Sequence, residues 1–351
     1  MTTQVAADVS RRHLCHQNNA PTNVGGYSAT ASHSKPPALL VILALAVVWA
    51  TCCSTVAASS PISIDTKVDA GTLTLNYKGR KLLVYTFATN QFKPYVRELY
   101  TLRGENVLRD APPDHLHHHG LMYAVWINGI NFWEERGEPG IQKHVEIPMQ
   151  LAHTDTKGVP TAKFMEVIHW LAPTNRAAAD SYSAALLAEQ RTLTLTVNET
   201  NKEVALRWES EFQVGPNAGK VKLHGPNYNG LGLRLPASFN HVAKFQNSEG
   251  LPYTGKNTQN VIAGRWTSVS GTTEGGEAML VLFRGKDSGR FFFTMLDPFT
   301  YLAVTQGLDK QPLEYSAGDR FSLSYLLTVY PETKTPEFIG QRGMEWEKGR
   351  R

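Results

Sequence analysis

The chain has 351 residues, of which 42% are hydrophobic and 19% charged, and its formal net charge is +4 with neutral histidines. This length can bury a large core, and because no basic stripe is visible, nucleic acid is not an expected partner. The sequence also lacks a glycine-rich phosphate loop, so we expect no nucleotide cofactor.

Residues 1–58 have the pattern of an export signal. Their apolar run, residues 38–50, follows a polar stretch and is shorter than the roughly 20 residues that a membrane-spanning helix needs. The small residues Val56, Ala57 and Ala58 fit a cleavage site, so we expect a cut after Ala58 and a periplasmic or extracellular protein without a stable transmembrane anchor. The unusually long polar start leaves open an internal translation start or retention of the segment as an anchor.

The cysteines limit what the mature chain can contain. All three, Cys15, Cys52 and Cys53, precede the expected cut. The mature protein therefore has no disulfide, and any metal site must use histidine, carboxylate or water ligands.

Alternation of apolar and polar residues predicts strands along the mature chain. In chain order, we expect strands at residues 72–77, 81–87, 163–171, 191–198, 204–208, 279–284, 290–296 and 321–329. Glycine, proline, asparagine and aspartate fill the gaps, and helical composition occurs in one stretch, residues 175–189. The pattern predicts an all-β fold, a large two-sheet antiparallel sandwich formed as a single domain by residues 59–351.

A histidine cluster lies between the expected strands 81–87 and 163–171. His115, His117, His118 and His119 follow a proline-rich turn and precede the apolar run 121–126. Neutral imidazole is the commonest metal ligand and a common general acid or base, so the cluster predicts a site at a loop entering a strand. On an extended backbone His115 and His117 would point to one face and His118 to the other. A merely solvated loop remains the alternative.

Further candidates follow this cluster. Trp133 could form a binding wall, and of the two glutamates after it at most one should reach the site; we choose Glu135. A glycine-rich turn could return His144 towards the cluster. The candidate catalytic residues are therefore His115, His117, His118, His144 and Glu135. The same four histidines could bind one divalent metal ion, or without metal could donate and accept protons; the sequence leaves both open.

Residues 224–236 contain a second group of candidate site residues. Tyr228 lies in a turn, and Arg234 lies between two leucines in an expected strand. The Arg234 guanidinium needs a carboxylate or a polar ligand in that apolar setting. Its partner can therefore be a carboxylate of the protein, in a salt bridge, or the substrate, and the sequence leaves both open. With Trp133, these two residues are the candidate substrate-binding residues.

These motifs together resemble a known family. Residues 114–118 (Asp-His-Leu-His-His), 129–133, 140–144, 228–236 and 318–321 follow in the order seen in exported bacterial proteins of the PmoA-like family, over roughly residues 70–335. The resemblance implies an exported β-sandwich similar to the supersandwich of galactose mutarotase-like proteins, found in polysaccharide-degrading bacteria. At position 119 family members carry arginine or lysine instead of histidine.

Three functions fit these features. The first is a carbohydrate-acting enzyme, a hydrolase, lyase or epimerase, that uses the histidines with or without a metal. The second is a non-catalytic protein that binds a carbohydrate or another small polar ligand. The third is a metal-dependent oxidoreductase, as the family label "methane oxygenase" suggests, although the membrane enzyme of that name is built of transmembrane helices that this chain lacks. No carboxylate pair can be assigned from the sequence, which favours histidine-based or metal-based chemistry.

Overall fold

A computed structural model describes residues 60–178, 181–253 and 259–349, all within a unit that runs from Ala57 to Arg351. The predicted export signal, residues 1–58, lies outside the described residues. Antiparallel strands make up most of the described elements, which confirms the all-β prediction. None of the described helices is both long enough and apolar enough to cross a membrane.

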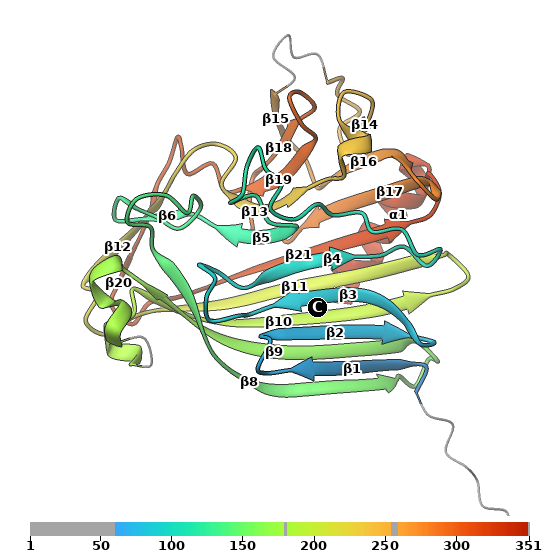
Figure 1. Cartoon of the computed structure of the whole chain (residues 1–351). Coiled ribbons are helices and arrows are strands. Elements are labelled where there is room, and N and C mark those ends of the chain that lie inside the picture. Colours follow the sequence, from blue (N-terminus) through green and yellow to red (C-terminus); the bar gives the residue numbers. More distant parts are fainter. Residues whose placement is uncertain (1–59, 179–180, 254–258, 350–351) are drawn as a thin grey trace, which may run out of the picture. The chain divides into compact units, whose positions relative to one another are not determined.

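The first of the two large sheets contains the strand that follows the histidine cluster, β5 (Leu121–Ala124) (Figure 1). Within the described chain its nine strands are, in spatial order, β1 (Ile62–Lys67), β2 (Thr72–Tyr77), β3 (Arg80–Thr86), β4 (Tyr95–Leu99), β5 (Leu121–Ala124), β13 (Gly230–Arg234), β19 (Tyr301–Thr305), β18 (Phe291–Met295) and β15 (Gln259–Ala263).

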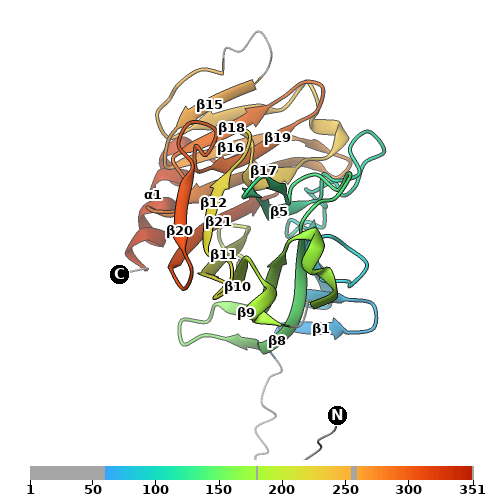
Figure 2. The same ribbon diagram turned by 90° about the vertical axis from the view of Figure 1, so that its left-hand side faces the viewer.

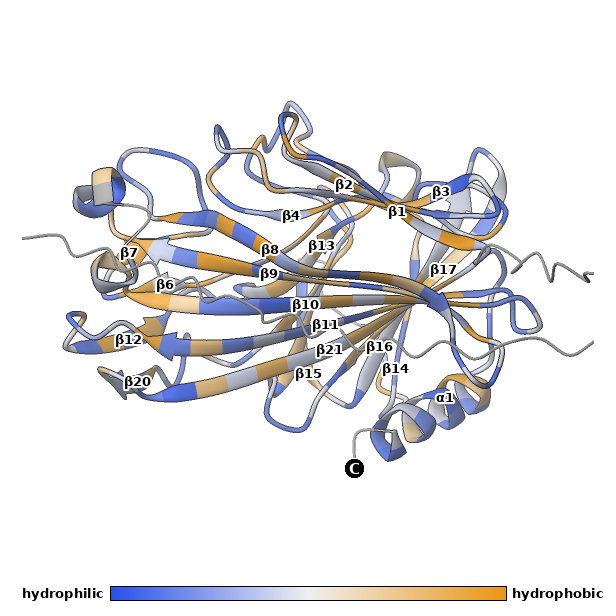
Figure 3. Cartoon of the chain, turned by 90° about the horizontal axis from the view of Figure 1, so that it is seen from below, coloured by the Kyte–Doolittle hydropathy of each residue, from blue (hydrophilic) through white to orange (hydrophobic). Residues whose placement is uncertain are grey.

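The second large sheet faces the first. Its eight described strands are, in order, β14 (Lys244–Asn247), β16 (Trp266–Thr273), β17 (Gly276–Arg284), β21 (Arg320–Tyr330), β11 (Glu203–Val214), β10 (Leu187–Asn198), β9 (Pro160–Leu171) and β8 (Ile141–Thr154). A smaller sheet contains β20 (Leu313–Ser316), β12 (Lys220–His224), β6 (Trp126–Ile127) and β7 (Ile130–Asn131). Figure 3 shows β1–β4 and β8–β11 as separate layers.

The main core lies between the two large sheets. In β10, Leu193, Leu195 and Val197 are buried in this core, while the threonines between them are partly exposed. The register places Leu193 opposite Trp208 of β11, which belongs to the same core. The period-two pattern therefore correctly predicted which face of the strand is buried, because alternate side chains of a strand point to opposite faces.

Little of the described chain is helical. The stretch 175–189, whose composition is helical, forms two 3₁₀ turns, η1 (Pro173–Ala178) and η2 (Tyr182–Ala184), before β10 begins at Leu187. A further 3₁₀ turn, η3 (Ala237–Phe239), follows β13. The α-helix α1 (Pro336–Lys348) begins with a Thr335 cap, whose hydroxyl accepts from the Phe338 amide at 3.3 Å.

Each large sheet also buries part of its outer face. Ile339 and Trp346 of α1 cover an apolar cluster on the eight-stranded sheet. On the nine-stranded sheet, Leu121 of β5 points into the main core, whereas its neighbour Met122 belongs to a second cluster on the opposite face. The loop that carries the clustered histidines, residues 110–120, lies over this second cluster.

Candidate functional site

The histidine loop, residues 110–120, is a compact turn. The His118 amide donates to the His115 carbonyl at 2.9 Å, and the Ala111 amide donates to the His118 carbonyl at 3.0 Å. Because the backbone folds back on itself, His115, His117 and His118 all face one cavity. The expectation that His118 points away from the other two is therefore wrong: it assumed an extended backbone, which these turns replace.

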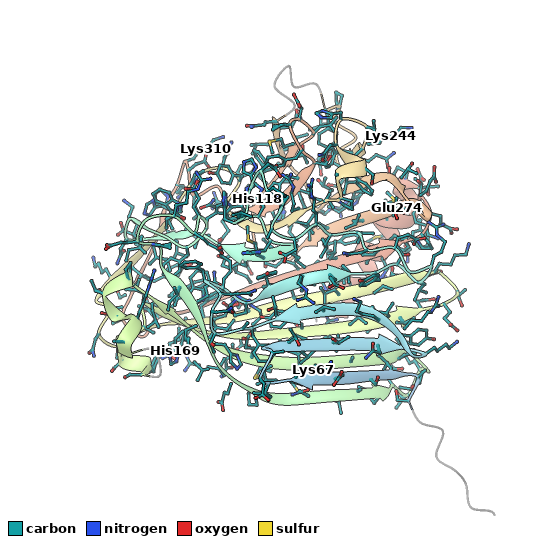
Figure 4. The ribbon with its side chains drawn as sticks, in the orientation of Figure 1. Lys67, His118, His169, Lys244, Glu274 and Lys310 are labelled. Atoms are coloured by element: carbon teal, nitrogen blue, oxygen red, sulfur yellow. The ribbon has the colours of Figure 1, made fainter. Side chains whose placement is uncertain are left out.

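The cavity has a volume of about 360 Å³, a size suited to a small ligand. Aromatic side chains form most of its wall, with Glu134 and Arg136 at its polar part. Its lining consists of His115, His117, His118, Trp133, Glu134, Arg136, Tyr228, Gln259, Phe293, Met295, Pro298, Phe299 and Tyr301. Figure 4 labels His118 in this region, well apart from His169.

The floor of the cavity is the outer face of the nine-stranded sheet. Gly232 of β13 lies opposite Ala303 of β19, which lies opposite Phe293 of β18, so these residues share one face. A Cβ at Gly232 would lie 1.7 Å from Tyr301 Oη and 3.3 Å from Trp133 Cη2. The glycine is therefore needed because the Tyr301 and Trp133 side chains occupy the space above it.

His117 and His118 are held neutral by their surroundings. The ring centroids of His115 and His118 are 4.5 Å apart and the rings are stacked, while His118 meets Phe299 edge-on at 5.1 Å. Burial, followed by the nearby His115 and positive side chains, lowers the pKa of His117 to about 4. Burial, followed by His117, lowers the pKa of His118 to about 2. At neutral pH these imidazoles therefore accept or donate hydrogen bonds without carrying charge.

Two polar atoms in the cavity wall have no hydrogen-bond partner in the described chain. They are Nδ1 of His118 and the hydroxyl of Tyr301, and both are buried. Burial raises the pKa of Tyr301 well above its usual range, so its hydroxyl keeps the proton. Buried polar groups are normally paired, so these two atoms would pair with a bound water molecule, or with a ligand if the side chains that cover them move aside.

His119 does not line the cavity but forms ion pairs with two carboxylates. Its Nδ1 is 2.9 Å from Asp110 Oδ1 and its Nε2 is 3.0 Å from Glu135 Oε1, and its ring stacks on Tyr95 at 3.9 Å. Burial opposes the charge, but the hydrogen bonds to the two carboxylates outweigh burial and raise the pKa of His119. The two carboxylates therefore favour the protonated, cationic form of His119.

Glu135 therefore has a structural role. It accepts from Lys93 Nζ at 2.5 Å as well as from His119, and these two cations, against the opposing effect of burial, lower its pKa to about 2. Glu134 lines the cavity and Glu135 does not. The choice of Glu135 as the catalytic carboxylate is not supported, because its ion pairs hold it outside the cavity wall while its neighbour Glu134 lines the cavity.

We predict that His119 stabilises the fold in acid more than in base. Because its folded-state pKa is raised, the stabilisation is fully present below the ordinary histidine pKa of about 6.5 and is lost as pH rises through the folded value. Urea unfolding of the wild type and of His119→Gln should differ most near pH about 5 and converge at alkaline pH. A difference that stays constant across this range would contradict the assignment, and His153→Gln serves as a control histidine on β8.

Arg234 lies beneath the cavity and does not line it. Its Nη2 donates to Asp114 Oδ2 at 3.0 Å, and its guanidinium lies 3.5 Å from the Phe299 ring centroid. The side chain is fully buried, burial lowers its pKa to about 10, and its Nε and Nη1 have no partner within the described residues. The structure thus shows the salt bridge, through which Arg234 supports the histidine loop and Phe299 from below, and a contact of Arg234 with substrate stays a prediction.

His144 does not join the cluster, so the expected convergence of four histidines is wrong. It lines a separate hollow of about 220 Å³, and its Nδ1 is 2.7 Å from Glu166 Oε1 of β9. Glu166 is fully buried and also accepts from Tyr85. The long strand β8 pairs with β9 in the eight-stranded sheet, which carries His144 away from the loop on the other sheet.

The described residues contain no group of three or more histidine, cysteine, aspartate or glutamate side chains placed to bind a metal ion. His115 and His118 stack on each other, and Asp114 pairs with His115 and Arg234, so these side chains would have to rearrange to converge on an ion. A divalent metal stays a prediction.

Eight of the thirteen residues that line the cavity were not among the candidate site residues expected from the sequence. Phe293 lies in a strand that the sequence predicted, whereas Tyr301 lies outside the predicted strands, and Phe299 follows a proline turn. Residues 291–295 and 301–305 are apolar at nearly every position instead of alternating, which was a signal that both faces of these strands are covered.

The fold and the site together define a two-sheet β-sandwich protein with an aromatic, histidine-lined cavity on the outer face of one sheet. The chain belongs to the family of unknown function DUF6807, which matches residues 72–342. A comparison with curated proteins finds no sequence match. The resemblance to PmoA-like proteins stays a prediction.

Several solved structures are similar to this chain at low identity. The GH36 α-galactosidase AgaB from Geobacillus stearothermophilus is 10% identical with a TM-score of 0.44, over 77% of this chain and 41% of that one. A heparan sulfate lyase HepC mutant from Pedobacter heparinus is 12% identical with a TM-score of 0.39, over 78% and 37%. A galactose mutarotase-like protein from Clostridium acetobutylicum is 12% identical with a TM-score of 0.36, over 77% and 98%. This chain thus spans about two fifths of the two longer proteins, and likeness at this level carries no argument about function.

Proposed function

We propose that this protein is an exported enzyme that acts on a carbohydrate bound in the histidine-lined cavity. The observation that carries the proposal is the pair of unpartnered polar atoms, His118 Nδ1 and Tyr301 Oη, among the aromatic side chains of the wall. A sugar has apolar ring faces that pack on aromatic rings and hydroxyl groups that pair with such atoms.

The cavity favours a lyase or epimerase over a hydrolase. Glu134 is the one carboxylate among the described lining residues, whereas a glycosidase of the usual kind needs two carboxyl groups flanking the bond. Neutral His118 can accept a proton, and Tyr301 can donate a hydrogen bond to a substrate oxygen as charge develops on it.

A non-catalytic carbohydrate-binding protein is the second candidate, and the pKa values favour it. A general base works best with a pKa near the working pH, whereas those of His117 and His118 lie at about 4 and about 2 in the free protein. Catalysis therefore requires the bound substrate to raise one of these values.

One experiment separates the two candidates. The mature protein is titrated calorimetrically with monosaccharides and neutral and acidic oligosaccharides, and each mixture is then analysed for new products. Binding with product formation supports the enzyme, and binding without products supports the binding protein. If no carbohydrate binds, both candidates fail. Metal analysis of the same sample tests the predicted divalent ion and, with it, the metal-dependent oxidoreductase.

Export is predicted from residues 1–58. Expressed with its full N-terminus in a Gram-negative host, the protein should appear in the periplasm or the medium, with an intact mass that corresponds to cleavage after Ala58. A full-length species in the cytoplasm would contradict this prediction.

A further inference from the structure

A further hollow, which we call the second hollow, lies beside the histidine cavity and next to the small sheet. It has a volume of about 460 Å³, and Trp126, Lys222, His224, Pro226 and Asp309 are among its lining residues. Figure 2 shows β12 and β20, two strands of this small sheet, on the near side of the view. None of the candidate site residues expected from the sequence contributes to its lining.

The two hollows share one wall, the turn between β12 and β13. Pro226 lines the second hollow and Tyr228 lines the histidine cavity, and two residues span at most about 7 Å of chain. The Asn229 amide donates to the Pro226 carbonyl at 3.0 Å, which closes the turn. Gly225 has a φ of +140°, and a Cβ there would lie 2.3 Å from Asn229 Oδ1. The wall is therefore thin and is held by specific contacts.

The second hollow offers the chemistry that a sugar needs. The Trp126 indole is half-buried, so part of its surface is available for contact, and the His224 ring lies edge-on to it at 5.7 Å. His224 Nε2 accepts from the Gly129 amide at 2.8 Å, while burial, followed by Lys222, lowers the pKa of His224. The neutral ring therefore carries its proton on Nδ1, which has no partner in the described part of the chain and can donate to a ligand.

Charge argues for an uncharged ligand. Lys222 and Asp309 are both exposed at the second hollow, and Arg136 and Glu134 form the corresponding pair in the histidine cavity. Each hollow thus presents one cation and one carboxylate, with no excess of positive charge to select an acidic sugar.

We infer that the second hollow is a further sugar subsite, and that the protein binds a neutral oligosaccharide across both hollows. The inference rests on the proposed function and adds to it the length and charge of the ligand. The histidine cavity binds the unit on which the protein acts, and Trp126 packs against a neighbouring unit on the other side of the shared wall.

The test compares ligand lengths in calorimetric titrations of the mature protein. The probes are cello-, xylo-, manno- and galacto-oligosaccharides from the monosaccharide to the hexasaccharide. In the wild type, affinity should rise once the chain is long enough to occupy both hollows. Trp126→Ala should lower the affinity for the long chains by about tenfold, the value of one aromatic contact, and leave the monosaccharide unchanged. Trp126→Phe should restore part of the loss.

Trp133→Ala is the matched control, because it should weaken binding at every length. If Trp126→Ala affects all lengths equally, or none, the second subsite is wrong while the proposed function stands. Binding confined to carboxylated or sulfated chains overturns the inferred neutral ligand. If Trp126→Ala does not fold, the double variant Lys222→Ala/Asp309→Ala replaces it, because both side chains are exposed. This variant must show the same loss of affinity for the long chains. If the long chains bind it as tightly as they bind the wild type, the result counts against the subsite.

Discussion

Replacing His118 by alanine is expected to reduce turnover on the carbohydrate substrate by about 10²–10⁴-fold, the usual contribution of a general acid or base. His118 is the cluster histidine whose Nδ1 lies buried without a partner in the described chain, and its ring contacts Phe299 and Trp133 in the cavity wall. Initial rates and ligand affinity, measured on the same preparation, check this result.

The fold of this variant needs its own measurement. As a loop residue, His118 would be expected to contribute little to stability, but its exposure is only 7%, so alanine should cost roughly 0.5–3 kcal/mol. His118→Gln fills more of the space and can still form hydrogen bonds, so it should retain binding better than alanine while remaining slow. If both variants keep full turnover, His118 is not the proton acceptor. If both variants bind the carbohydrate normally and the wild type shows no turnover, the binding-protein candidate stands.

Replacing Arg191 by methionine is expected to lower the free energy of unfolding by about 3–5 kcal/mol, because the change leaves a buried carboxylate without its cation. The Arg191 guanidinium donates to both oxygens of Glu189, at 2.8 and 2.9 Å, and both side chains have an exposure of 0%. It also donates to Tyr85 Oη at 3.0 Å and to the Pro94 carbonyl at 2.9 Å. Urea unfolding followed by tryptophan fluorescence measures the loss.

Arg207→Met is the matched control for this result. Arg207 lies on β11 of the same sheet and pairs with Glu209 at 3.9 Å, but both side chains are more than a third exposed. Solvent screens such pairs, so the loss should stay below about 1 kcal/mol. Equal losses in the two variants would mean that burial of Arg191 does not determine its contribution, and the network around Glu189 would have to be reconsidered.

The period-two pattern predicted eight of the 21 described strands, and this was sufficient to predict the two-sheet sandwich. Residues 191–198 and 321–329 show why: their apolar side chains recur at every second position, and the structure buries that face in the main core. The helix at Pro336–Lys348 was missed because its apolar residues are few, and it is held by packing against the outer face of the eight-stranded sheet. Residues 175–189 have helical composition, but pairing of β10 with β9 and β11 overrides that local preference.

The sequence by itself predicted a candidate site of histidines and Trp133 at the loop before β5, because residue type and turn signals are local. Only the tertiary structure decided which of them meet. Turns in the loop bring His118 to the same side as His115 and His117, and ion pairs with Asp110 and Glu135 turn His119 away from the cavity. Strand pairing places His144 on the other sheet, beside Glu166. Such outcomes depend on contacts between residues far apart in the chain, which local patterns do not encode.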